Sequence, residues 1–260
     1  MNHVAKRTIS GLLTAALVVG LMLYLPFKVV LPAMIALAAL VHLEFSQMVA
    51  RKHEIMTWTG VVAGVAWLVS VFYTGIVQQI AACVMGASFL GFWLKALFGK
   101  AEKPLASLGT TLLGVCYVPF MLTWFIKIPQ VHGMMMLLYI VAIIKISDMG
   151  GFAFGMAFGR HKMCPMISPG KSWEGMAGSV FASIVISLAF MPLTHFVWWK
   201  ALAFGVAAAV VGTLGDLVES RFKRECEVKD SSTFMPAGMG GFLDMFDSLV
   251  FAPALLYPFI

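Results

Sequence analysis

Long apolar segments alternate with short polar breaks along the chain. Nine segments approach the roughly 20 residues that a membrane-spanning helix needs: 9–25, 29–49, 55–74, 76–98, 104–126, 132–158, 174–197, 199–220 and 240–259. Gly75 predicts a tight turn between two of them, and Lys127, Pro129 and His132 predict a loop. The pattern predicts an all-α polytopic membrane protein with about nine transmembrane helices.

Two longer polar insertions, 147–174 and 221–240, interrupt this pattern. No internal repeat or low-complexity linker divides the sequence, so we predict a single integral-membrane domain over 1–260. Within it, we predict that 1–130 forms a scaffold with the dimer and lipid contacts. We predict that 131–260 carries the catalytic helices, with both polar insertions in the cytoplasm.

Composition supports this class. Hydrophobic residues make up 61% of the chain and charged residues only 12%, whereas soluble domains carry about 25% charged residues. If the N-terminus is cytoplasmic, fourteen of the 18 Lys and Arg residues face the cytoplasm and three face the outside, with Lys145 inside a span. This asymmetry favours a cytoplasmic N-terminus and an outer C-terminus. It also explains the net charge of +6 without nucleic acid as a partner.

Acidic residues are concentrated near the C-terminus. Seven of the 12 Asp and Glu residues lie between Gly215 and Ser248: Asp216, Glu219, Glu225, Glu227, Asp230, Asp244 and Asp247. The spacing of Asp216, Glu219 and Lys223 places them on one helix face, as does that of Asp244 and Asp247. Carboxylates suit Mg²⁺ with phosphate ligands, and neighbouring Lys and Arg suit a polyphosphate. We therefore predict nucleotide chemistry at two helix ends.

The first polar insertion offers a second group of candidates. Ser168 to Lys171 predicts a short turn that leads into a helix opening with Trp173 and Glu174. Such a helix N-terminus favours anions. Asp148 is either a site residue or a salt-bridge partner of Lys145, and Trp173 either a site residue or an interfacial anchor.

Glu44 lies inside the second apolar segment, beside His42. An acid within a membrane span is a site hypothesis by default. A buried partner elsewhere in the helix bundle explains it equally well, so the sequence leaves its role open.

At these residues the chain resembles the phosphatidate cytidylyltransferase (CDP-diacylglycerol synthase) family. The family signature S-x-x-K-R-x4-K-D is matched by 220–230, preceded by the usual lead-in at Gly215–Glu219. Ser147-Asp148 and Ile167–Gly175 match two further landmarks, so the resemblance covers roughly 145–250. Two departures stand out: Met239 replaces an expected histidine in a loop one residue longer, and Met245 replaces an expected arginine.

The resemblance implies an enzyme that converts CTP and phosphatidate, or another lipid phosphate, to CDP-diacylglycerol and pyrophosphate for phospholipid biosynthesis. It implies Mg²⁺ and a homodimer, and it leaves a second cation open. The location implied is the bacterial cytoplasmic (inner) membrane, with the site facing the cytoplasm.

The resemblance also implies site residues. The catalytic set is Asp216, Lys223, Arg224, Lys229, Asp230, Asp244 and Asp247. Of these, Asp216, Asp244 and Asp247 are the expected metal ligands. The substrate-binding set is Asp148, Ser168, Pro169, Lys171, Trp173, Glu174, Glu219, Ser220, Gly240 and Gly241.

Two other functions remain open from the sequence. Met239 and Met245 leave room for a related CTP-dependent enzyme acting on another lipid phosphate or a polyprenol. A secondary transporter would instead use Lys145, Asp148 and Glu44 as an intramembrane pathway. Clustering of the acids at one predicted face, and the absence of an inverted repeat in the sequence, argue against the transporter.

Overall fold

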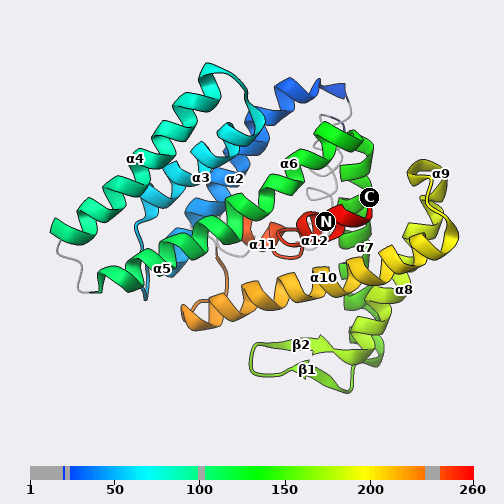
Figure 1. Ribbon diagram of the computed structural model, residues 1–260. Coiled ribbons are helices and arrows are strands. Elements are labelled where there is room, and N and C mark those ends of the chain that lie inside the picture. The colour runs from blue at the N-terminus through cyan, green and yellow to red at the C-terminus, as the bar shows by residue number, and fades with distance from the viewer. Residues whose placement is uncertain (1–19, 21–23, 99–102, 232–240) are drawn as a thin grey trace, which may run out of the picture.

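The computed structural model describes residues 20, 24–98, 103–231 and 241–260 (Figure 1). The longer helices are α2 (Phe27–Val49), α3 (Thr57–Phe72), α4 (Ile76–Phe98), α5 (Pro104–Val115), α6 (Met121–His132), α7 (Met134–Phe158), α8 (Trp173–Ala189) and α10 (Trp198–Glu225). A π-helical turn, Cys116–Phe120, joins α5 to α6. The described part of the chain is therefore mostly helical, with one two-stranded hairpin.

Five stretches of these helices are long and apolar enough to cross a membrane: Phe27–Val49, Ile76–Leu94, Pro104–His132, Met134–Phe158 and Trp198–Glu225. The apolar helices Thr57–Phe72 and Trp173–Ala189 are shorter. These lengths fit a helical membrane protein. The count of nine spans and the orientation of the termini stay predictions, and most of the predicted span 9–25 lies outside the described residues.

The core lies where α2, α6, α7 and α10 meet. Val41 and Phe45 of α2, Ile140 of α7 and Ala208 of α10 are fully buried there. Because these helices are apolar on nearly all sides, membrane lipid and protein neighbours can cover them equally well. Buried polar groups pair between helices: the Tyr139 and Ser187 hydroxyls are hydrogen-bonded at 2.7 Å.

Helices α7 and α8 pack closely through glycine. A Cβ atom built on Gly150 would lie 2.7 Å from the carbonyl oxygen of Gly178, and one built on Gly178 would lie 2.7 Å from that of Gly150. The two backbones can approach this far only because both residues lack a side chain. This contact fixes where α7, and Asp148 with it, lies relative to α8.

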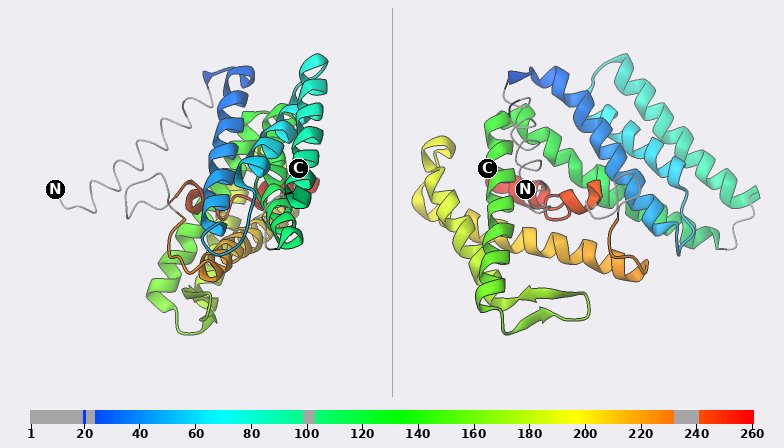
Figure 2. Two further views of the ribbon diagram at one scale, coloured as in Figure 1. Left: turned by 90° about the vertical axis from the view of Figure 1, so that its left-hand side faces the viewer. Right: turned by 180° about the vertical axis from the view of Figure 1, so that it is seen from behind.

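The polar insertion between α7 and α8 forms a hairpin of β1 (Lys162–Cys164) and β2 (Ser168–Ser172). The strands are antiparallel, with Lys162 opposite Ser172 and Cys164 opposite Ser168. The hairpin projects beyond the ends of α7 and α8 in all three views (Figures 1 and 2). Ser172 ends β2 and caps α8, because its hydroxyl accepts a hydrogen bond from the Gly175 N–H at 3.1 Å.

The C-terminal segment passes through the middle of the molecule. It contains α11 (Phe242–Phe246), α12 (Ala252–Leu256) and a 3₁₀ turn, Tyr257–Phe259. Helix α12 packs between α6 and α10, and α11 packs against α2 (Figure 1). This arrangement brings Asp244 and Asp247 against the carboxyl-terminal half of α10.

Several predicted boundaries are wrong. The predicted span 240–259 is broken, in its described part, into two five-residue helices and a 3₁₀ turn, with Pro253 and Pro258 at helix starts. Helix α6 continues through Lys127 and Pro129, and the break comes at Gly133, whose φ of 83° favours glycine.

The two polar insertions are only partly loops. Residues 147–158 continue α7, as the overlapping predicted span 132–158 implies, and 221–225 continue α10 beyond its predicted end at 220. Ser168–Lys171 is strand rather than a short turn. The predicted span 174–197 ends at Ala189, and α9 (Met191–Thr194) follows it.

Substituting Gly178→Ala should loosen the α7–α8 packing, because the new methyl group meets backbone atoms that cannot move aside. We expect a loss of about 1–3 kcal/mol in stability, measured as a lower thermal unfolding temperature in detergent. Gly109→Ala is the matched control, since nothing lies within 4 Å of its added Cβ. Equal unfolding temperatures for the two variants would contradict the close approach.

Candidate active site with an acidic cluster

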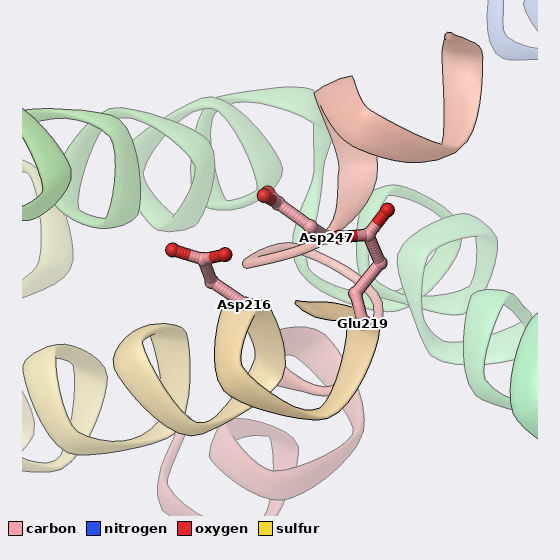
Figure 3. A group of neighbouring side chains, drawn as sticks. All are labelled: Asp216, Glu219 and Asp247. Carbon is pink, nitrogen blue, oxygen red and sulfur yellow. The ribbon is translucent and has the colours of Figure 1, made fainter. Parts of the chain in front are cut away.

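Three carboxylates from two elements meet beside α10. Asp216 and Glu219 lie one turn apart on α10, and Asp247 follows α11. One oxygen of each lies within 4.8 Å of the others. Figure 3 shows the three side chains on the side of α10 that faces the α11 segment. The α-helical spacing of 216 and 219 and the folding back of the C-terminal segment together create this group.

The electrostatics of Asp247 reflect this crowding. Asp247 lies outside the five long apolar helices. Burial, followed by the nearby Asp216 carboxylate, raises the pKa of Asp247 from 3.8 to about 6. A divalent cation between the carboxylates would relieve the repulsion, and three hard oxygen donors are what Mg²⁺ accepts. The residues present therefore fit a divalent-cation site.

A lysine and a serine flank Asp216. Lys171 of β2 forms a salt bridge with Asp216 at 2.5 Å. The Ser220 hydroxyl donates to the other Asp216 oxygen at 3.3 Å. Of the predicted substrate-binding residues, Lys171 and Ser220 thus lie directly at the acidic group.

Asp244 is not one of the three grouped carboxylates, but it lies next to Glu219, and both bind Lys223. The Lys223 ammonium is 2.5 Å from Glu219 and 3.0 Å from Asp244, and it is largely buried. Asp244 also accepts hydrogen bonds from the backbone N–H groups of Gly241 at 2.7 Å and Ser231 at 3.2 Å. The geometry thus gives Asp244 a role in capping α11 and holding Lys223, while Glu219 joins Asp216 and Asp247.

Helix α7 contributes a second polar group next to Asp247. Lys145 donates to the Met245 carbonyl at 3.0 Å and to the Ser248 hydroxyl at 3.1 Å. Ser248 donates to Asp148 at 2.8 Å, and Lys145 lies 3.8 Å from Asp148. Asp148 is therefore both a partner of Lys145, which was one of its two expected roles, and a neighbour of the acidic group.

The hairpin positions the other predicted residues. Glu174 accepts from the backbone N–H groups of Arg160 and His161 and contacts the His161 ring at 2.6 Å, so it closes the base of the hairpin. Arg224 donates to the Ile167 carbonyl at 3.3 Å, which ties α10 to the hairpin. Trp173 is 60% exposed at the start of α8, as an interfacial anchor would be.

The remaining predicted residues are more peripheral. Ser168 is half-buried and Pro169 exposed, both on β2. Lys229 and Asp230 are exposed just after α10. Gly240, like Met239, lies outside the described residues, whereas Gly241 caps α11.

Sequence reasoning missed some contacts. Its metal set contained Asp244 and not Glu219, although the spacing of Asp216 and Glu219 already placed both on one face. The sequence also gave no indication that Tyr117 lies near the site. The centroid of its ring is 5.2 Å from that of Phe222, which follows Glu219 by one turn of α10. Tyr117 is on the π-helical turn, and π-bulges often mark functional sites.

Comparison with known proteins shows the family of this chain. The sequence model of the cytidylyltransferase family matches residues 5–260, almost the whole chain. The chain belongs to this family. The family resemblance that we predicted from the sequence is thereby confirmed.

Among curated family relatives, a phosphatidate cytidylyltransferase of Staphylococcus aureus (strain COL) is 40% identical over 147 residues, 56% of each chain. One from Haemophilus influenzae is 40% identical over 127 residues, 46% of this chain and 44% of the relative. One from Staphylococcus epidermidis is 38% identical over 147 residues, again 56% of each chain. The chain thus spans about half the length of the curated relatives it matches.

Replacing Asp247 by Asn should stabilise the metal-free protein. Burial, followed by the nearby Asp216 carboxylate, makes a charged Asp247 costly for folding; the pKa shift from 3.8 to about 6 corresponds to about 3 kcal/mol at neutral pH. We expect Asp247→Asn to raise the unfolding temperature in EDTA at pH 7. The gain should shrink as the pH falls from 6 and vanish well below 3.8, where the carboxyl is protonated both folded and unfolded.

The same variant should lose the stabilisation that Mn²⁺ gives the wild type, because one ligand has gone. Glu225→Gln, which changes an exposed acid at the end of α10, is the control. A variant that is less stable in EDTA, or that retains the Mn²⁺ effect, would argue against a shared cation site.

Proposed function

We propose that the protein is an integral-membrane phosphatidate cytidylyltransferase that converts CTP and phosphatidate to CDP-diacylglycerol and pyrophosphate. The observation that carries this proposal is the meeting of the Asp216–Glu219–Asp247 group with Lys171 and Lys223. Carboxylates that fit a divalent cation, beside ammonium groups that fit phosphates, are the parts for nucleotidyl transfer. Family membership and the names of the relatives point the same way.

The reaction needs no covalent enzyme intermediate. An oxygen of the lipid phosphate forms a bond to the α-phosphorus of CTP, and the bond from that phosphorus to the bridging oxygen of the β-phosphate breaks. Pyrophosphate leaves with the electron pair. The attacking oxygen is already anionic, so positioning and charge neutralisation supply most of the catalysis.

Residue roles follow from the contacts. Asp216, Glu219 and Asp247 would hold Mg²⁺, which supplies charge neutralisation on the nucleotide phosphates when it is bound. Lys171 and Lys223 place positive charge beside these carboxylates and would bind phosphate oxygens. Asp244 keeps Lys223 in place, and Ser220 orients Asp216.

The remaining predicted residues keep supporting roles in the proposal. Arg224, Lys229 and Asp230 would form the cytoplasmic side of the nucleotide site, together with the β1–β2 hairpin. Asp148 would stabilise the Asp247 segment through Ser248.

We further propose that the protein resides in a bacterial cytoplasmic membrane as a homodimer, with this site facing the cytoplasm. The diacyl substrate would then reach the site laterally from the bilayer and CTP would enter from the water. The transporter alternative has less support, since Lys145 and Asp148 bind the segment that carries Asp247 rather than a separate pathway.

Purified protein in detergent or nanodiscs should release labelled pyrophosphate from γ-labelled CTP when phosphatidate and Mg²⁺ are both present. Asp216→Asn should lower turnover by about 10²-fold or more, because it removes a cation ligand and the partner of Lys171. Glu225→Gln, an exposed acid at the end of α10, is the control. Polyprenol and polyprenyl phosphate should be inert.

Absence of turnover by the wild type, or full activity of Asp216→Asn, would reject the assignment. Preferential use of a polyprenol substrate would replace it with the related-enzyme alternative.

A further inference from the structure

Glu44 of α2 binds the backbone of the segment that carries two acids of the site. Its side chain is fully buried, and Oε2 accepts a hydrogen bond from the Leu243 N–H at 2.9 Å, across 199 residues of sequence. Leu243 lies in the first turn of α11, and its N–H has no partner within that helix. Because a buried N–H needs an acceptor, this bond fixes the start of α11 against α2.

Gly241 shows how tight the contact is. A Cβ atom added to Gly241 would lie 2.6 and 2.9 Å from the two oxygens of Glu44. The glycine N–H instead donates to Asp244 at 2.7 Å. Two carboxylates therefore share the N–H groups at the beginning of α11, Asp244 from within the segment and Glu44 from another helix.

The next residue of α2 contacts the other side of the site. Phe45 packs edge-on against Phe222 of α10, with ring centroids 5.6 Å apart, and lies 5.1 Å from Tyr117. Phe222 lies one turn beyond Glu219 on α10. Adjacent residues of α2 thus contact the two elements whose approach creates the acidic group.

Asp247 lies one helical turn after Leu243 and keeps helical backbone angles (φ −46°, ψ −55°). A shift at Leu243 is therefore transmitted to the Asp247 carboxylate. We propose that Glu44 is a positioning residue that sets the distance between Asp247 and the Asp216–Glu219 pair, and thereby the affinity of the site for a divalent cation, without touching the cation. Its link to turnover rests on the proposed function.

Two substitutions of similar size separate the hydrogen bond from packing. Glu44→Gln keeps a carbonyl acceptor for the Leu243 N–H, whereas Glu44→Met fills the space without one. The probe is Mn²⁺ alone, which accepts the same oxygen ligands as Mg²⁺, titrated by electron paramagnetic resonance into the full-length protein without nucleotide or lipid. We expect Glu44→Met to weaken Mn²⁺ binding about tenfold, and Glu44→Gln to bind nearly as the wild type does.

His42→Leu is the matched control. His42 is equally buried on α2 but faces Gly60 and Gly64 of α3 rather than α11. It should change stability and leave Mn²⁺ affinity as it is. If Glu44→Met does not fold, Glu44→Asp, whose shorter side chain withdraws from Leu243, replaces it and should also weaken Mn²⁺ binding.

Equal Mn²⁺ affinity in the wild type, Glu44→Gln and Glu44→Met would overturn the inference, even if the wild type transfers cytidylate normally. Weakened binding in His42→Leu as well as in Glu44→Met would also overturn it, by showing a general loss of packing. No Mn²⁺ binding by the wild type would overturn it too. The expected Mn²⁺ pattern in a protein without cytidylyltransferase activity would support the positioning role and reject the proposed function.

Discussion

The ammonium group of Lys223 joins the two parts of the chain on which the site depends. It bonds to Glu219 on its own helix and to Asp244 at the start of the C-terminal segment. A buried charge is costly unless it is paired and hydrogen-bonded, so a lysine between two carboxylates fixes their positions strongly. Without this bridge, negative charges on α10 and after α11 would repel each other. The geometry of the acidic group therefore depends on the two ion pairs of Lys223, although the lysine itself need not contact the cation.

Around this bridge, each structural element restrains the acids from a different direction. The hairpin brings Lys171 to Asp216, α7 brings Lys145 and Asp148 to Ser248 in the Asp247 segment, and α2 brings Glu44 to the start of α11. Residues from both halves of the sequence thus hold one site. A catalytic centre built on rigid helices, with the irregular backbone enclosed between them, suits a membrane protein in which exposed backbone groups are costly.

The sequence predicted the helical membrane class and the family, because long apolar runs and the 220–230 signature depend on local composition alone. It placed Asp216, Lys171 and Asp247 among the candidate site residues, and the structure brings their side chains together, although the role of each stays a prediction. Asp244 and Asp247 have helical spacing, yet the capping of α11 turns Asp244 towards Gly241 and Lys223. Similarly, the largely apolar stretch 240–259 was predicted as one span, whereas its prolines and its enclosure by α6 and α10 break its described part. Such outcomes depend on contacts between distant segments, which periodicity cannot reveal.

The most direct test is an experimental structure of the protein with Mn²⁺, using anomalous scattering to locate the ion. We expect one peak whose nearest neighbours are oxygens of Asp216, Glu219 and Asp247, with ion-to-oxygen distances of roughly 2.0–2.6 Å, typical of hard cations. A peak that contacts Asp244 instead of Asp247 would contradict this expectation. So would a structure in which Asp247 lies too far from Asp216 and Glu219 for one ion to bind all three.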